Sequence, residues 1–211
     1  MFEEYPKCAK LRDGQEVILR LMVREDEQKL VEFFRRLPPE DRLFLKDDVT
    51  DPEVILRWTE NLDYTHVIPI LAECEDRIIG DATLHRNRYG WSTHVGEIRL
   101  VTDPDFRHQR LGRILAREIF FLALVLKLDK VIARMMEDQQ GAIRVFTALG
   151  FEREALLKNY VRDLEGKHHN LIIMSQDVIG FWRRIEDQIA DTMSVHSGTD
   201  IPPESSRSGG S

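Results

Sequence analysis

The sequence predicts an α/β protein with a central mixed β-sheet of about seven strands flanked by helices. Two observations predict this class. Apolar, β-branched segments alternate with helical segments only in the second half of the chain, which is typical of a sheet that contains parallel and antiparallel strands. The chain has 211 residues and is 42% hydrophobic, so it can bury one sizeable core. We expect one domain over residues 16–178, after a polar lead-in over residues 1–15.

Seven segments have the short, apolar and β-branched character of strands. These segments are residues 16–23, 66–73, 77–85, 95–102, 130–134, 151–162 and 168–177. The second and third are expected to form a hairpin across Glu75-Asp76, and the last two a hairpin across a turn at residues 164–166. Gly80, inside the third segment, predicts a bulge or a close approach of another part of the chain.

Helices are expected where apolar residues recur at helical spacing, or where Asp and Pro mark a helix start. Such segments are residues 26–37, a short helix from Pro39, and residues 51–61, 111–128, 140–149 and 179–193. The segment 111–128 carries one broad apolar face, and Gly150 follows the segment 140–149 as a residue that ends a helix. Residues 194–211 are rich in Ser, Gly and Pro, so we expect a disordered tail there.

The bulk composition excludes several functional classes. Charged residues of both signs make up 32% of the chain and the net charge is -7, which argues against a uniformly basic face for nucleic acid. The first residues lack the apolar core of a secretory signal, and the longest apolar stretch, residues 119–126, is too short to cross a bilayer. Cys8, Cys74 and the pair His168-His169 lack the spacing of a metal site. We expect a cytoplasmic protein with free thiols, no metal and no membrane partner.

One segment, residues 101–117, carries the pattern of an anion-binding site. A strand ends, the chain turns at Pro104, and a helix opens near Gly112, where unpaired N–H groups and the helix dipole favour an anion. The basic or potentially basic side chains around this helix start are Arg107, His108, Arg110 and Arg113. Cations are unfavourable at a helix start, so this cluster makes better sense around a bound anion. The alternative is a solvated basic turn beside Asp103 and Asp105.

The same segment resembles the acetyl-CoA signature V-x-x-P-x-x-R-x-x-G-x-G of the GNAT superfamily of N-acyltransferases. The residues that fit the signature in register are Val101, Pro104, Arg107 and Gly112. The family's second hallmark is a helix that ends in an apolar residue followed by Gly-Phe, and residues 142–151 match it. The resemblance covers residues 16–178. It implies a splayed sheet in which two adjacent parallel strands part, here the segments 95–102 and 130–134.

The resemblance also implies acetyl-CoA as the cosubstrate. Its pantetheine arm would insert between the parted strands, along Leu100, Val101 and Thr102. Its diphosphate would meet the backbone amides of Arg107, His108, Gln109, Arg110, Leu111, Gly112 and Arg113. Gln139 and Phe146 would complete the contacts. Three positions depart from the family pattern: Arg110 replaces a glycine, Gln139 an asparagine, and Phe146 the tyrosine with which many members protonate the leaving thiolate.

Two residues are candidates for the chemistry. Transfer of an acetyl group to an amine needs a general base that takes the amine proton, and Glu97, on the strand before the signature, is our candidate. Alternation puts Glu97, Arg99 and Val101 on one face of that strand. The alternative for Glu97 is an ion pair with Arg99 or with a charge on a neighbouring strand. Tyr160 is the candidate acid in place of Phe146, and its alternative is an aromatic side chain that packs on the sheet.

We therefore expect an acetyl-CoA-dependent N-acetyltransferase that acts on a primary amine by direct attack within a ternary complex. The amine can belong to a small molecule, a protein N-terminus or a lysine, and the sequence does not choose among them. The alternative is a CoA-binding regulatory or interaction module without turnover, which the three departures motivate. Whether the protein forms a homodimer is left open.

Overall fold

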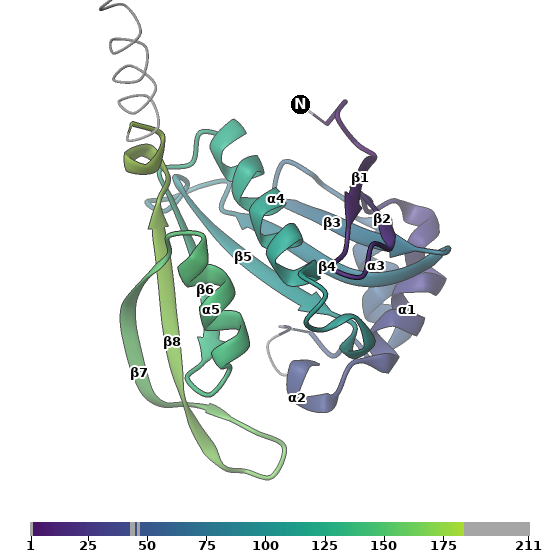
Figure 1. The fold of residues 1–211 in the computed structure, drawn as a ribbon. Helices are drawn as coiled ribbons and strands as arrows, with labels where there is room; N and C mark the ends of the chain where they lie inside the picture. Colours follow the sequence, from purple (N-terminus) through teal and green to yellow (C-terminus); the bar gives the residue numbers. More distant parts are fainter. Residues whose placement is uncertain (1, 43–44, 46, 184–211) are drawn as a thin grey trace, which may run out of the picture. The chain divides into compact units, whose positions relative to one another are not determined.

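Eight strands form one mixed sheet in the part of the chain that the computed structural model describes, residues 2–42, 45 and 47–183. The strands are β1 (Lys7–Lys10), β2 (Glu16–Leu21), β3 (Val67–Cys74), β4 (Arg77–Arg86), β5 (Val95–Thr102), β6 (Lys130–Met136), β7 (Glu152–Arg162) and β8 (His168–Asp177). Their order across the sheet is β1-β2-β3-β4-β5-β6-β8-β7 (Figure 1). All neighbours are antiparallel except β5 and β6, which are parallel. The predicted mixed sheet is confirmed.

The additional strand, β1, lies inside the segment 1–15, for which we expected only a polar lead-in. It pairs antiparallel with β2, and Cys8 lies opposite Ile18. The four residues Lys-Cys-Ala-Lys are too few and too polar to show a strand pattern on their own. The strand forms because β2 offers it an edge with which to pair.

The α-helices agree with the predicted helical segments over the described residues, and two short 3₁₀ helices were not predicted. The helices are η1 (Arg24–Asp26), α1 (Glu27–Arg36), α2 (Pro39–Arg42), α3 (Pro52–Glu60), η2 (Pro104–Phe106), α4 (Leu111–Val125) and α5 (Gln140–Ala148). The predicted helix over residues 179–193 lies largely, and the predicted tail over residues 194–211 entirely, outside the described residues. Residues up to Ile179 form one compact unit, to which every feature below belongs. No helix among the described residues is long and apolar enough to span a membrane.

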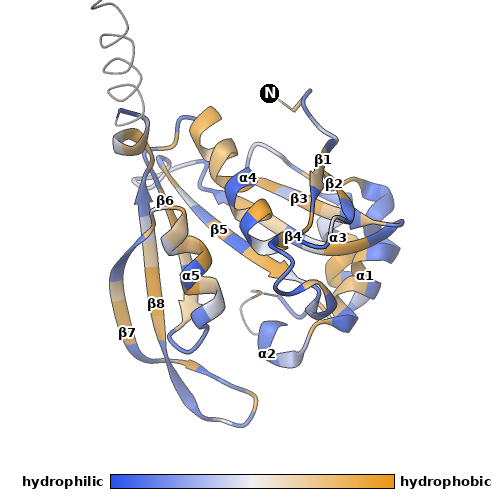
Figure 2. Ribbon diagram, viewed as in Figure 1, coloured by the Kyte–Doolittle hydropathy of each residue, from blue (hydrophilic) through white to orange (hydrophobic). Residues whose placement is uncertain are grey.

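Helices cover both faces of the sheet (Figure 1). On the α4 face, a Cβ placed on Gly80 would lie only 2.7 Å from Leu115 Cδ1, and the β3–β4 register shifts beside this glycine. Gly80 is therefore the predicted site of both a bulge and a close approach. On the opposite face, Phe34 of α1, Ile55 of α3 and Leu71 of β3 belong to one buried cluster. Figure 2 shows hydrophobic residues along α4 and α1, the helices that cover the two faces of the sheet.

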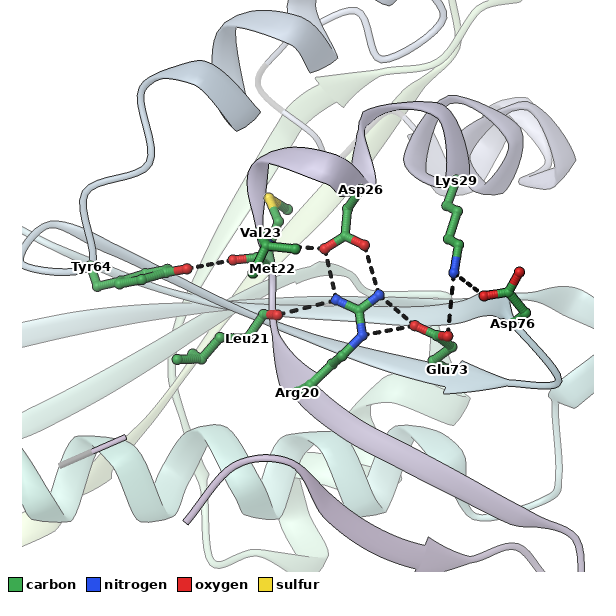
Figure 3. Close-up of polar contacts among 9 residues, drawn as sticks. All are labelled: Arg20, Leu21, Met22, Val23, Asp26, Lys29, Tyr64, Glu73 and Asp76. Carbon is green, nitrogen blue, oxygen red and sulfur yellow. Dashed lines mark hydrogen bonds and ion pairs between the residues drawn. The ribbon is translucent and has the colours of Figure 1, made fainter. Parts of the chain in front are cut away.

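A buried ionic cluster fixes the start of α1 to β2 and β3 (Figure 3). Both oxygens of Asp26, which is 3% exposed, accept hydrogen bonds of 2.7 Å from the Arg20 guanidinium. Arg20 Nε also donates to Glu73 at 2.7 Å, and Lys29 of α1 pairs with the same Glu73 at 3.3 Å. Asp26 is the residue before α1, and its carboxylate accepts hydrogen bonds from Arg20 and from the Val23 N–H instead of capping the helix.

Candidate functional site

The parallel strands β5 and β6 pair over only part of their length. The ladder ends at the pair Ile98–Ala133, yet β5 continues to Thr102 and β6 to Met136. Beyond that pair the two strands part, and we call this opening the fork. β4 still pairs with β5, and β8 with β6, alongside it. Each strand therefore turns one edge of N–H and C=O groups toward the fork, where a ligand with amide groups can bind as a strand would.

The loop after β5, residues 103–110, is held at both ends. Asp103 is 1% exposed, and its carboxylate accepts hydrogen bonds from Arg36 at 2.9 Å and from Arg77 at 2.7 Å. Burial opposes ionisation of Asp103, but the hydrogen bonds from Arg36 and Arg77 outweigh it, so the pKa of Asp103 is lowered. At the other end, the Gln109 carbonyl accepts the Arg12 N–H of the β1–β2 turn at 3.1 Å. The loop thus has a fixed position relative to the fork.

The start of α4 has the geometry of an anion site. His108 and Arg110 both have left-handed backbone conformations, with φ of 62° and 69°. Such residues turn neighbouring N–H groups toward a common point, a geometry that binds anions. The first hydrogen bond along the helix joins the Ile114 N–H to the Arg110 carbonyl, so the N–H groups of residues 111–113 have no acceptor within the helix. The φ of Arg110 also explains why a glycine is expected at this position.

The predicted basic residues lie around this helix start. The side chains of Arg107, His108, Arg110 and Arg113 are exposed. Arg107 donates to the carboxylate of Asp41 in α2. Partial burial raises the pKa of Asp41, although Arg107 acts in the opposite direction. A carboxylate thus already binds one arginine of the predicted diphosphate site.

The side chains of the remaining residues predicted to bind the cofactor point in different directions. Leu111 is buried at 2% exposure, so only its backbone can meet a ligand. Leu100 faces α4, because a Cβ on Gly112 would lie 3.8 Å from Leu100 Cδ2. Val101 packs against the cluster under α1. Thr102 is the last residue of β5, on the edge of the fork.

Glu97 lies just before the fork, on the face covered by α1 and α3. Its Oε1 accepts hydrogen bonds from Arg99 at 3.2 and 3.3 Å, and its Oε2 lies 3.9 Å from the guanidinium of Arg134 in β6. The ion pair with Arg99 is the predicted alternative for Glu97. Together, Arg99 and Arg134 place the Glu97 carboxylate between two cations. Arg134 was not among the predicted residues, because its nearness to Glu97 depends on the β5–β6 register.

The other predicted residues lie further along the chain. Gln139 precedes α5, and its side chain accepts the Met136 N–H at 3.0 Å, which fixes the end of β6. Phe146 is 5% exposed and packs edge-to-face on Phe151 at 5.0 Å. Tyr160 is 63% exposed, next to an irregularity in the β7–β8 ladder. The contacts of these three residues with a cofactor or an acceptor stay predictions.

A second polar feature lies at the turn end of the β7–β8 hairpin. His169 Nε2 is 2.7 Å from Asp163, and His169 Nδ1 is 3.4 Å from Asp138. The hydrogen bond with His169 lowers the pKa of Asp163. A pocket of about 350 Å³ here is lined by Glu137, Asp138, Asn159, His168, His169 and Asn170. Within the described ranges, no three His, Cys, Asp or Glu side chains are grouped as metal ligands.

Known proteins match this chain in family and in fold. The model of the acetyltransferase (GNAT) family matches residues 28–151. The GNAT domain of S. lividans PAT has a TM-score of 0.68 at 16% identity, over 82% of this chain and 97% of that one. The ribosomal-protein-alanine N-acetyltransferase of Brucella melitensis has a TM-score of 0.65 at 21% identity, over 75% and 98%. The protein yncA of Salmonella typhimurium, solved with its cofactor acetyl-CoA, has a TM-score of 0.66 at 18% identity, over 77% and 94%.

Proposed function

The chain belongs to the acetyltransferase (GNAT) family, and on this premise we propose that it is an N-acetyltransferase that transfers the acetyl group of acetyl-CoA to a primary amine. The observation that carries the proposal is the fork between β5 and β6 beside a helix start with free N–H groups. The fork offers strand edges to a pantetheine arm, and the helix start offers donors to a diphosphate. The amine belongs to a small molecule, a protein N-terminus or a lysine.

The residues along the fork and the loop fit acetyl-CoA in this proposal. Residues 100–102 line the pantetheine arm, and the amides of residues 107–113 hold the diphosphate. Gly112 has room around it, since a Cβ there would meet only Leu100 Cδ2 at 3.8 Å. Gln139 acts by holding the end of β6 at the mouth of the fork. Phe146 acts by supporting α5 through its contact with Phe151.

The chemistry in this proposal is direct attack. Bound acetyl-CoA supplies the acetyl group as a thioester with a thiolate leaving group. Glu97 accepts the proton that the amine loses as the new C–N bond forms, and Arg99 holds its carboxylate in place. Phe146 has no proton to donate, so the candidate donor to the thiolate is Tyr160, whose exposure leaves its hydroxyl accessible. We also expect a cytoplasmic location, which the two free cysteines support.

Thiol release from acetyl-CoA with a panel of amines and peptides tests this proposal. We expect saturable release that Glu97→Gln lowers strongly in kcat with little change in the acetyl-CoA Kd. Saturable CoA binding without release on a broad panel, unaffected by Glu97→Gln, would favour the alternative of a regulatory module. Size-exclusion chromatography of the same protein decides between a monomer and a homodimer.

Calorimetry of acetyl-CoA binding tests the placement of the diphosphate. Arg107→Ala removes a charge-assisted contact, so we expect affinity to fall by about tenfold to a hundredfold. Gly112→Asp should weaken binding by charge repulsion, since a Cβ alone fits. Arg117→Ala, an exposed arginine further along α4, is the matched control and should leave affinity unchanged. Unchanged affinity in both site variants would show that the diphosphate binds elsewhere.

A further inference from the structure

The face of the fork covered by α1 and α3 carries more positive than negative charge. Arg99 and Arg134 both lie within 4.0 Å of Glu97, and no other carboxylate in the described part of the chain lies within that distance of either guanidinium. Arg99 shares a strand face with Glu97. Arg134 shares it too, because Ile132, two residues earlier in β6, is the register partner of Glu97. Two guanidinium groups thus share one carboxylate.

A further carboxyl group on this face, that of Asp81, does not offset this excess of positive charge. Asp81 of β4 lies opposite Val101 in the ladder, so it shares the face, but it is only 6% exposed. Burial raises the pKa of Asp81 to about 7, although a hydrogen bond from Thr83 lowers it. Asp81 is therefore protonated in part at neutral pH. The local excess of positive charge is notable in a chain whose net charge is -7.

Arg99 and Arg134 differ in exposure and in whether their N–H donors are used by Glu97. Arg99 is 16% exposed in its side chain and donates hydrogen bonds to Glu97. Arg134 is 43% exposed, and its 3.9 Å separation from Glu97 is too long for a hydrogen bond. The donors of Arg134 are thus not used by Glu97, and a planar guanidinium with several donors matches a carboxylate. Arg134 also follows Ala133, the last β6 residue paired with β5, so it lies at the fork.

We propose that Arg134 binds a carboxylate of the acceptor, so that the enzyme selects small amino acids in which amine and carboxylate are a few bonds apart. The inference rests on the proposed function, since it is Glu97 that receives the amine. Arg134 and Glu97 lie 3.9 Å apart, so one small ligand can place its amine at Glu97 and its carboxylate at Arg134. Arg134 is then a specificity residue and takes no part in proton transfer.

A pair of acceptors that differ only in the carboxylate tests the proposal: β-alanine against propylamine, with β-alaninamide as the neutral isostere. We expect kcat/KM to favour β-alanine by about tenfold or more, as for a charge-assisted hydrogen bond. Arg134→Ala should remove that preference, by raising the KM for β-alanine much more than the KM for propylamine. Arg134→Lys should restore part of it. Arg144→Ala, an exposed arginine on α5, is the control and should leave both acceptors unchanged.

The outcomes separate this proposal from the function on which it rests. If wild type releases thiol equally with β-alanine and propylamine, or if Arg134→Ala lowers both equally, the carboxylate subsite is wrong while acetyl transfer stands. If no amine supports thiol release, both proposals fail. An unchanged acetyl-CoA Kd in Arg134→Ala shows that the variant is folded, so a lost preference then supports the subsite.

Discussion

Asp81→Asn should stabilise the protein at alkaline pH and have much less effect in acid. Asp81 is 6% exposed, and its Oδ1 accepts a hydrogen bond of 3.1 Å from Thr83. Burial raises its pKa from the ordinary 3.8 to about 7, with the Thr83 bond acting in the opposite direction. Asparagine keeps the size of the side chain and its oxygen acceptor, and it has no proton to lose.

The magnitude follows from the difference between the two pKa values. Because folding raises the pKa of Asp81, the folded protein holds the proton more tightly than the unfolded chain does. The free energy of unfolding therefore falls as pH rises from about 4 to about 7, by roughly 4 kcal/mol at most, at about 1.4 kcal/mol for each pKa unit. Between pH 5 and pH 8 the loss is roughly 2–3 kcal/mol. Asp81→Asn should remove this loss.

Urea unfolding of wild type and Asp81→Asn at pH 5 and pH 8 measures the effect. The variant's stability relative to wild type should rise by roughly 2–3 kcal/mol between the two pH values. Asp129→Asn, which changes an exposed carboxyl group, is the control and should show no such rise. A difference between Asp81→Asn and wild type that is the same at both pH values would refute the reasoning.

Two further predictions concern backbone strain and the ionic cluster. Arg110→Gly should raise the Tm of the protein without ligand, because Arg110 holds a left-handed conformation with φ of 69°, which costs about 1 kcal/mol in residues other than glycine; an unchanged or lower Tm in a thermal scan would contradict this. Asp26→Asn should lower the free energy of unfolding by about 2–3 kcal/mol, because it removes the more buried of the two carboxylates that bind Arg20 and leaves only Glu73. Glu60→Gln, which breaks the exposed pair with Arg24, should cost under about 1 kcal/mol, and equal losses in the two variants would argue against a buried cluster.

The order of strands and helices could be predicted because each element carries its own local pattern. The pair Asp51-Pro52 predicted the start of α3, and in the structure the Asp51 side chain accepts the Glu53 N–H as a helix cap. Glu75 and Asp76 were predicted to form the turn between β3 and β4, and both adopt left-handed backbone conformations there. β1 could not be predicted, because its polar residues become a strand only through pairing with β2.

Candidate site residues could be proposed from the sequence where they lie close together in the chain. Residues 101–113 contain both the end of the fork strand and the start of α4, so one motif sufficed for them. Arg134 and Asp41 are far from this segment in the chain, and they reach it only through the β5–β6 register and the position of α2. Charge partners set by tertiary structure have no local signal in a single sequence.

The central claim is that acetyl-CoA lies in the fork with its diphosphate at the start of α4, and a crystal structure of the complex tests it most directly. We predict a pantetheine arm hydrogen-bonded between residues 100–102 of β5 and residues 134–136 of β6. We also predict diphosphate oxygens within hydrogen-bond distance of the N–H groups of residues 111–113. Acetyl-CoA bound at any other place, with β5 and β6 in contact along the fork, would contradict the claim.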